Sequence, residues 1–177
     1  MRRARSLSAR RSTDASTMVA ASLFLLALTA SGPDVRALSF EAYPSLVPEP
    51  KSLAPANLTS NPRAHDYRTV IRRSDAQPVN FAGHLTVTRI GCGTSCAFLV
   101  LVDRRDGHVH FFPDGVLSWA GDFGDDYGFT FRRESRLLRA CGQLNEAGPS
   151  KCWYYEWARG GPKLVAERPW KRRRTSR

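Results

Sequence analysis

Four cysteines, Cys92, Cys96, Cys141 and Cys152, are the residues whose type and spacing most readily suggest chemistry in this sequence. A redox-active dithiol usually separates its cysteines by two residues and places them at the start of a helix, which lowers the thiol pKa. Cys92 and Cys96 have three residues between them and lie between two predicted strands. We therefore predict structural disulfides. Of the three possible pairings we favour Cys92–Cys96 and Cys141–Cys152, because each pair is close in sequence and brackets turn residues that include glycine.

Histidines could supply acid–base or metal chemistry. His108 and His110 alternate along one predicted strand, so both imidazoles would point to the same face. His84 could supply the third ligand that a zinc site needs, if its strand lay nearby. Because Val109 and Phe111 occupy the opposite, core-facing side, we expect His108 and His110 to face solvent. We predict no metal site and no other cofactor.

His84 is our first candidate for a ligand contact. Leu85 and Val87 should face the core, and this alternation places His84 on the outer face of the strand with Thr86. A histidine there contributes little to packing, and Gly83 beside it would leave room for a ligand to approach closely, or could instead mark a bulge. The alternative is a buried, hydrogen-bonded structural histidine, since small domains often keep one satisfied polar group inside.

Three large aromatic residues, Trp153, Tyr155 and Trp157, alternate along one predicted strand and would share one face. Such a stripe usually belongs to the core, because aromatic side chains bury large apolar areas. If it were exposed, it would form a platform for a sugar or a protein partner. We therefore retain these three residues as binding candidates beside His84.

Three carboxylates, Asp122, Asp125 and Asp126, lie in a glycine-rich stretch. Their spacing is not that of a helix–loop–helix calcium loop, so a solvated turn is the simpler interpretation. The same residues could form a glycosidase pair, although nothing in the sequence sets the required separation or a raised pKa. We recognise no Ser/His/Asp set, nucleophile elbow or phosphate-binding glycine loop.

The N-terminal residues 1–37 have the three parts of a signal peptide. Five arginines precede an uncharged, mostly apolar run of 13 residues, Met18–Ala30, and small residues follow it. A membrane-spanning helix needs about 20 apolar residues, so we expect cleavage rather than anchoring and no membrane span. Export would place the mature chain in the periplasm or outside the cell, where disulfides form.

The net charge of +11 is concentrated at the two ends of the chain. Residues 1–37 hold six arginines against two aspartates, and the last ten residues hold six basic side chains and no acidic one. Residues 38–167 are close to neutral, with 15 basic and 14 acidic side chains. Because the folded part of the chain is nearly neutral, we do not expect it to carry a basic surface, and we predict no nucleic-acid partner. We interpret residues 169–177 as a basic disordered tail.

The elements that must position these residues form one predicted domain, residues 59–168. Four prolines and the lack of a sustained period make residues 38–58 an extended arm. Asn61 and Pro62 are typical of a helix start, and the helix should end near Asp75.

From residue 81 the hydrophobic period changes to two, which predicts strands separated by tight turns. Pro113–Gly115 is one such turn. The predicted fold is α+β and mainly β: one N-terminal helix packed on an antiparallel β-meander of about seven strands, stapled by disulfides. After the first strand, the others are expected near residues 97–103, 108–112, 127–132, 136–140, 152–158 and 163–167.

Five segments form a distinctive pattern along the chain: Phe81–His84, Gly91–Cys96, Asp106-Gly107, Glu134–Leu138 and Tyr154–Trp157. They resemble the motifs of a group of small uncharacterised exported bacterial proteins, which include FAGHY, WGCGTSC and DSRLL. Leu85 and Ile90 depart from the group's pattern, which has an aromatic residue and Trp there. The resemblance covers roughly residues 59–167 and implies the same domain limits, without implying an activity.

These observations favour an exported, non-catalytic binding or interaction module of the cell envelope, whose partner is an envelope component or a protein. The alternative is a small envelope hydrolase that uses His84 with the Asp122, Asp125 and Asp126 carboxylates. The sequence leaves the ligand and the oligomeric state open.

Overall fold

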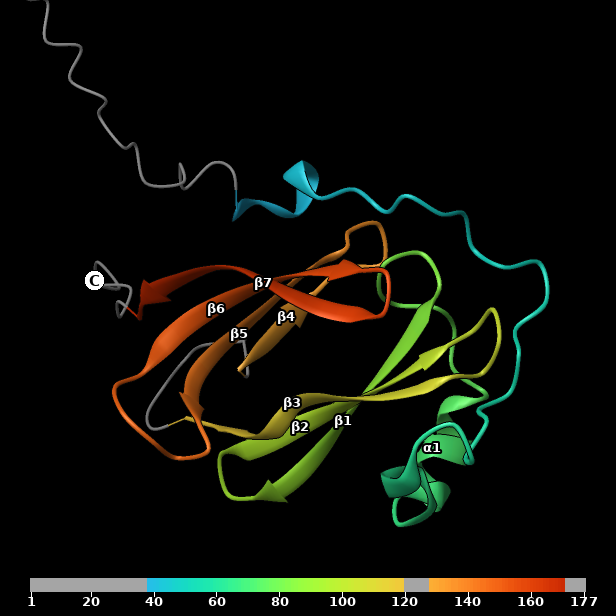
Figure 1. Cartoon of the computed structure of the whole chain (residues 1–177), viewed down its shortest axis with the longest axis horizontal. Helices are drawn as coiled ribbons and strands as arrows, with labels where there is room; N and C mark the ends of the chain where they lie inside the picture. Colours follow the sequence, from blue (N-terminus) through green and yellow to red (C-terminus); the bar gives the residue numbers. More distant parts are fainter. Residues whose placement is uncertain (1–37, 120–127, 171–177) are drawn as a thin grey trace, which may run out of the picture. The chain divides into compact units, whose positions relative to one another are not determined.

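The computed structural model describes residues 38–119 and 128–170 (Figure 1). The predicted fold class is confirmed: within these residues the chain forms one α-helix and seven antiparallel strands. The predicted signal peptide, the Asp122, Asp125 and Asp126 group and residues 171–177 of the basic tail lie outside the described residues. The strands are β1 (Leu85–Gly93), β2 (Cys96–Asp103), β3 (Val109–Ser118), β4 (Phe129–Phe131), β5 (Leu137–Leu144), β6 (Lys151–Ala158) and β7 (Gly161–Pro169).

The strands follow the order β1-β2-β3-β5-β6-β7, with β4 paired to β5. Strand β5 connects two halves of the sheet, because its end pairs with β3 at Leu117↔Leu144 while its beginning pairs with β4. Figure 1 shows the β1–β3 half and the β4–β7 half as two layers. The strands pair mostly with their neighbours in sequence, as in the predicted meander.

The larger hydrophobic core lies between these two halves. The ring of Phe112 on β3 is 4.7 Å from that of Tyr155 on β6 and 6.4 Å from that of Phe129 on β4, in edge-on contacts. Trp153 and Trp157 are buried in the same cluster, and Tyr155 packs against it. The predicted aromatic stripe is therefore part of the core, which is the interpretation that its composition favoured.

A second core lies between the β1–β3 half and the helical segment that precedes it (Figure 1). Ile71 of α1 (Arg68–Ser74) is fully buried there together with Ala64 of a 3-10 helix, η3 (Pro62–His65). The ring of Tyr67 meets that of Phe98 on β2 edge-on, with 5.2 Å between the ring centres. Both faces of β2 are thus covered, which explains its continuous apolar sequence.

The predicted N-terminal helix is present and ends near Asp75, but it does not run without interruption from Asn61, because a 3-10 helix precedes α1 in this segment. Asn61 does cap this 3-10 helix: its side chain accepts a hydrogen bond from the backbone N–H of Arg63. The 3-10 helix ends at His65, and α1 begins at Arg68 without a side-chain cap. Short 3-10 segments are common next to α-helices, and helical periodicity alone does not separate the two.

The C-terminal end of α1 is joined to the sheet by a buried arginine. Arg104, which is only 2% exposed, donates to a carboxylate oxygen of Asp75 at 3.1 Å and to the Asp75 backbone carbonyl at 3.0 Å. The same carboxylate oxygen accepts from the backbone N–H of Ala56 at 2.8 Å. One carboxylate therefore holds the arm, the helix end and the residue after β2 together.

The arm, residues 38–58, is mostly extended and contains one 3-10 turn, η2 (Phe40–Ala42). Besides the contact from Ala56 to Asp75, its backbone N–H groups donate to backbone carbonyls of the rest of the domain from Ser45 to Glu134, from Ala54 to Arg104 and from Asn57 to Gly107. Among the described residues, no helix has both the length and the apolar character needed to cross a membrane.

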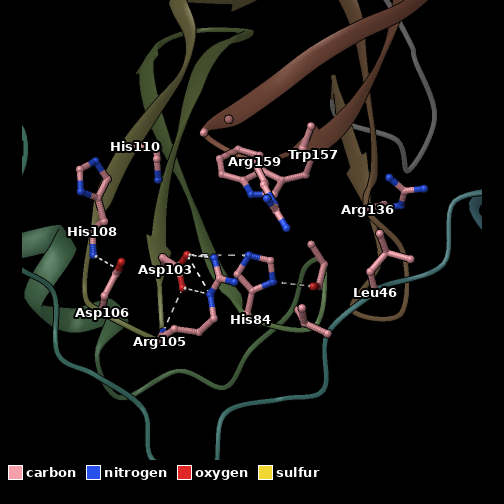
Figure 2. Close-up of a pocket in the computed structure, with 15 residues that line it drawn as sticks. Leu46, His84, Asp103, Arg105, Asp106, His108, His110, Arg136, Trp157 and Arg159 are labelled. Atoms are coloured by element: carbon pink, nitrogen blue, oxygen red, sulfur yellow. Dashed lines mark hydrogen bonds and ion pairs between the residues drawn. The ribbon is translucent and has the colours of Figure 1, made fainter.

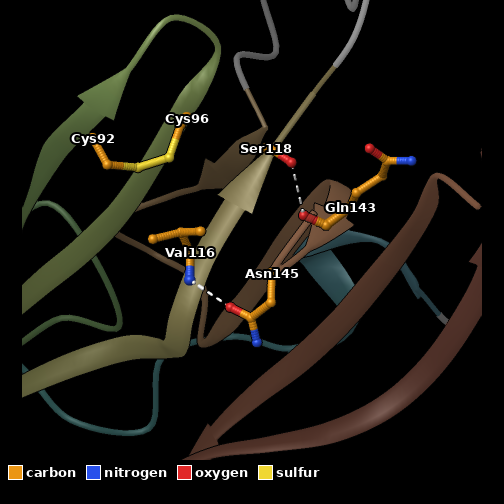
Figure 3. Close-up of a disulfide and its surroundings, with 6 residues drawn as sticks. All are labelled: Cys92, Cys96, Val116, Ser118, Gln143 and Asn145. Atoms are coloured by element: carbon orange, nitrogen blue, oxygen red, sulfur yellow. Dashed lines mark hydrogen bonds between the residues drawn. A yellow bond between two sulfur atoms is a disulfide. The ribbon is translucent and has the colours of Figure 1, made fainter. Parts of the chain in front are cut away.

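The predicted turn at Pro113–Gly115 is wrong, because β3 continues through it. Leu99 pairs with Phe112 and Ala97 pairs with Leu117, so β3 carries an irregular bulge between these pairs. The side chain of Asn145 fills this bulge and accepts from the backbone N–H of Val116 at 3.0 Å (Figure 3). A polar side chain from the turn after β5 thus replaces the ladder partner that the bulge removes.

Both predicted disulfides are present. Cys92–Cys96 closes the β1–β2 hairpin (Figure 3), and Cys141–Cys152 joins β5 to β6 at directly opposed positions. No free cysteine occurs in the part of the chain that the structure describes.

Candidate functional site

The turn before β1 places His84. The backbone N–H of Leu85 donates to the carbonyl of Phe81 at 2.9 Å, and both residues between Phe81 and His84 have positive φ angles, 50° at Ala82 and 74° at Gly83. A positive φ is costly for alanine, and such strain persists only where the surrounding structure enforces it. Here the backbone N–H groups of Ala82 and Gly83 donate to carbonyls of the β4–β5 connection, at 3.1 and 2.8 Å.

Gly83 is required by its surroundings as well as by its φ angle. A Cβ atom at this position would collide with the side chain of Ser45 and the carbonyl of Val47, both in the arm. The Ser45 hydroxyl lies 2.8 Å from the Ala82 carbonyl, to which it can donate. The predicted close approach at Gly83 is therefore made by the chain's own arm, and the turn is fixed from two sides.

The predicted outward position of His84 is wrong, because the residue is only 6% exposed. His84 still belongs to the turn, so the strand alternation that begins at Leu85 does not describe its side chain. Thr86, which we also expected on an open face, is fully buried because this face carries the second core, and its hydroxyl donates to the carbonyl of Pro78.

One imidazole nitrogen of His84 is satisfied and the other is not. Nδ1 lies 2.7 Å from the carbonyl of Ala82, and because a carbonyl only accepts, Nδ1 carries the proton. Nε2 makes no hydrogen bond, and its nearest charged neighbour is a carboxylate oxygen of Asp103 at 3.8 Å. Burial lowers the pKa of His84 below its ordinary value of 6.5, so at neutral pH Nε2 is a hydrogen-bond acceptor.

Asp103, at the end of β2, is the carboxylate beside His84. Burial alone would raise the pKa of Asp103, but hydrogen bonds from Arg105 outweigh burial and lower it. The Arg105 guanidinium donates to both carboxylate oxygens, at 3.0 Å from Nε and 2.6 Å from Nη2, and the Arg105 backbone N–H donates as well. Asp103 is therefore ionised at neutral pH and held in one orientation.

His84 and Asp103 open into a pocket of about 670 Å³, which lies at one end of the two halves of the sheet (Figure 2). The arm contributes Leu46 and Val47, and the β6–β7 turn contributes Arg159. Figure 2 shows the side chain of Arg159 reaching into the pocket toward His84. The other lining residues are Ala82, Arg105, Asp106, His108, His110, Arg136, Trp157, Ala158, Gly160 and Gly161.

His108 and His110 form one wall of this pocket, with 4.6 Å between their ring centres. Val109 between them is buried on the opposite face, as predicted, and His108 is exposed. His110 is half-buried against Trp157, with ring centres 5.1 Å apart, which differs from the predicted solvent-facing position. Burial, and then the neighbouring His108, lower the pKa of His110.

Two guanidinium groups from the other half of the sheet face the same space. Arg136 pairs with Glu156, while its Nε is buried without a hydrogen-bond partner. Arg159 is exposed and makes no hydrogen bond or ion pair within the described residues. The pocket therefore offers acceptors from the β1–β3 side and donors from the β4–β7 side.

Of the four residues we predicted as binding candidates, His84 and Trp157 line this pocket, whereas Trp153 and Tyr155 do not. The structure also brings His108 and His110 into the pocket with His84, although no group of three His, Cys, Asp or Glu side chains in residues 38–119 and 128–170 could hold a metal ion. Asp103, Arg105, Arg136 and Arg159 were not predicted as site residues. The available signal was the polar residues at the end of a buried strand and just after it, as Asp103 and Arg105 are.

We expect the melting temperature of the domain to fall as the pH is lowered from 7 to 5. The pKa values of His84 and His110 lie below 6.5 in the folded state, whereas the unfolded chain titrates near 6.5. Below that pH the unfolded state binds protons that the folded state does not, which favours unfolding until the pH passes the folded-state pKa values. Thermal unfolding at pH 7, 6 and 5 measures the effect.

The matched variants for this measurement are His84→Asn and His65→Asn. His84→Asn should reduce the dependence of the melting temperature on pH more than His65→Asn does. The control replaces a histidine that is exposed on η3. A melting temperature that stays constant or rises between pH 7 and pH 5 would contradict the assignment of buried neutral histidines.

Comparisons of this chain with protein-family models, with curated proteins and with solved structures find no match.

Proposed function

We propose that the chain is an exported, non-catalytic binding module of the cell envelope, and that its ligand occupies the pocket around His84. The export part of this proposal is supported by the apolar run Met18–Ala30 after an arginine-rich start and by the two disulfides, which persist in oxidising compartments.

The observation that carries the proposal is the orientation of His84. Nε2 of His84 makes no hydrogen bond to the described residues, and it is not among their buried unsatisfied atoms, so it is open to a pocket of about 670 Å³ that His84 lines. A strained turn, the arm and the β4–β5 connection together hold this imidazole in place. Such fixed polar groups in a concave site are typical of ligand recognition, because a preorganised group loses little entropy on binding.

We expect His84→Asn to weaken ligand binding at least tenfold while the domain stays folded. The asparagine Nδ2 can replace Nδ1 as donor to the Ala82 carbonyl, so the variant removes Nε2 and keeps the turn. Native mass spectrometry of protein isolated from the envelope of the producing cells would show the bound small molecule as an added mass. The added mass should be present in the unmodified protein and in His65→Asn, and lost from His84→Asn. Equal retention by both variants, or no added mass at all, would contradict the proposal.

One observation favours the alternative, an envelope hydrolase. Neutral His84 presents an Nε2 lone pair beside Asp103, an arrangement that could accept a proton from water. The aspartates that we predicted as its partners, Asp122, Asp125 and Asp126, lie outside the described residues, and none of the lining residues is Ser, Thr or Cys. Release of p-nitrophenol from p-nitrophenyl glycosides or acetate, abolished in His84→Asn, would favour the hydrolase.

A further inference from the structure

We propose that the pocket binds an acidic saccharide, a sugar ring that carries hydroxyl groups and a carboxylate. This inference rests on the proposed function and names the class of ligand. Three features of the pocket support it: a pair of acceptors in the β1–β3 half, a pair of guanidinium groups in the β4–β7 half and an apolar rim supplied by the arm.

The two hydrogen-bond acceptors, His84 and Asp103, favour a ligand that carries hydroxyl groups. Nε2 of His84 and the nearest oxygen of Asp103 are 3.8 Å apart, and neither donates a hydrogen bond at neutral pH. A ligand hydroxyl placed beside this pair could donate to one of them and accept from another pocket group. Because Arg105 neutralises Asp103, the pair does not require a cation, which makes a neutral hydroxyl the suitable donor.

The guanidinium groups of Arg136 and Arg159 favour an anionic group on the same ligand. Arg159 reaches into the pocket from the β6–β7 turn and has no partner in the described part of the chain (Figure 2). Arg136 also lines the pocket, but it is paired with Glu156 and its Nε is buried, so Arg159 is the guanidinium placed to contact a ligand. Guanidinium groups bind carboxylates with parallel hydrogen bonds, which gives both affinity and orientation.

The rim supplies an apolar surface for the C–H groups of a sugar ring. Leu46 is 73% exposed, an unusual position for a large aliphatic side chain, and it lines the pocket together with Val47 and Trp157. A ligand seated there would cover part of Leu46. The pocket volume of about 670 Å³ lies within the range of small-molecule sites and leaves room for a sugar ring.

A small inorganic anion matches the pocket less well. Such an anion would satisfy Arg159 but would bring no hydroxyl donor to His84, and it would lie near the carboxylates of Asp103 and Asp106. A neutral sugar would satisfy His84 and leave Arg159 without its ion pair. Only a ligand with both groups uses both sides of the pocket.

The test is a titration of the full mature chain at pH 7 with D-glucuronate, D-galacturonate, D-glucose and acetate, followed through the NMR signals of the histidine rings. We expect at least one of the two sugar acids to bind at least tenfold more tightly than both D-glucose and acetate, and to shift the His84 signal. The pH is fixed because several titratable or charged groups line the pocket around His84, and their protonation states must not change during the titration. These groups are Asp103, Arg105, Asp106, His108, His110, Arg136 and Arg159.

Two arginine variants separate recognition of the carboxylate from general effects of charge. Arg159→Ala should lower the affinity for the sugar acid at least tenfold, to the level of D-glucose, and leave D-glucose binding unchanged. Arg73→Ala removes an exposed arginine on α1 and should change neither affinity. His84→Asn should lower the affinity for both the sugar acid and D-glucose.

Each contrary result overturns the inference in a distinguishable way. D-glucose binding as tightly as the sugar acids would show that the carboxylate is not recognised, and acetate binding as tightly would show an anion site. If none of these probes binds while the envelope-derived mass is still lost from His84→Asn, the saccharide assignment is wrong and the proposed function stands. If that mass is also absent, the proposed function fails as well.

Discussion

Replacing Arg104 with methionine is expected to lower the free energy of unfolding by about 3 kcal/mol, since breaking a buried ion pair leaves an uncompensated charge. Methionine keeps much of the packing volume, so the loss reports the missing partner of Asp75 rather than a cavity. The estimate lies at the low end of the usual range because the Asp75 side chain is still 21% exposed. Denaturant unfolding at pH 7 measures the change directly.

The control is the other arginine on the same carboxylate. Arg72 lies 3.9 Å from Asp75 with its side chain 58% exposed, and Arg72→Ala should change stability by less than about 0.5 kcal/mol. Equal losses in the two variants would show that burial of Arg104 does not determine the strength of the pair.

The second large effect concerns the disulfide between β5 and β6. Replacing both Cys141 and Cys152 with alanine is expected to cost about 3 kcal/mol, because the unfolded chain regains the entropy of an open loop. The same change at Cys92 and Cys96, only four positions apart, should cost about 2 kcal/mol, since the loop is shorter. For a domain of this size, the first loss corresponds to a fall in melting temperature of roughly 10 °C.

Thermal unfolding of the two double variants under identical conditions checks this order. A larger loss from the Cys92 and Cys96 pair than from the Cys141 and Cys152 pair would contradict the loop-entropy explanation and indicate that the β1–β2 hairpin depends on its staple for native contacts.

The strands were predictable from the sequence because each has a local signature. The apolar run of β2 reflects its burial on both faces, and the two disulfides join cysteines that are neighbours in the sequence. The bulge at Pro113–Gly115 was not predictable, since it depends on Asn145, which reaches it from the turn after β5. Local turn residues indicate a change of direction but not whether a distant side chain will keep the strand paired.

The site was only half predictable for a similar reason. His84 was identified beside Gly83, but its orientation depends on a hydrogen bond from Ser45 and on hydrogen bonds that its turn donates to the β4–β5 connection, which lie about 40 to 50 residues away in sequence. Arg159, in the β6–β7 turn, and Asp103, at the end of β2, come together only when the two halves of the sheet pack. The alternation of polar and apolar residues along one strand does not show which distant residues will lie beside it in the fold.

The order of the disulfides along the chain has a consequence for biogenesis. Cys92 pairs with Cys96, the next cysteine in sequence, and Cys141 pairs with Cys152 in the same way. When a chain is translocated N-terminus first into an oxidising compartment, each cysteine that emerges can be oxidised only with those already across. If the chain is exported as proposed, sequential oxidation produces the native pairs directly, and maturation of this domain would then require an oxidant but no reshuffling of wrong disulfides by an isomerase.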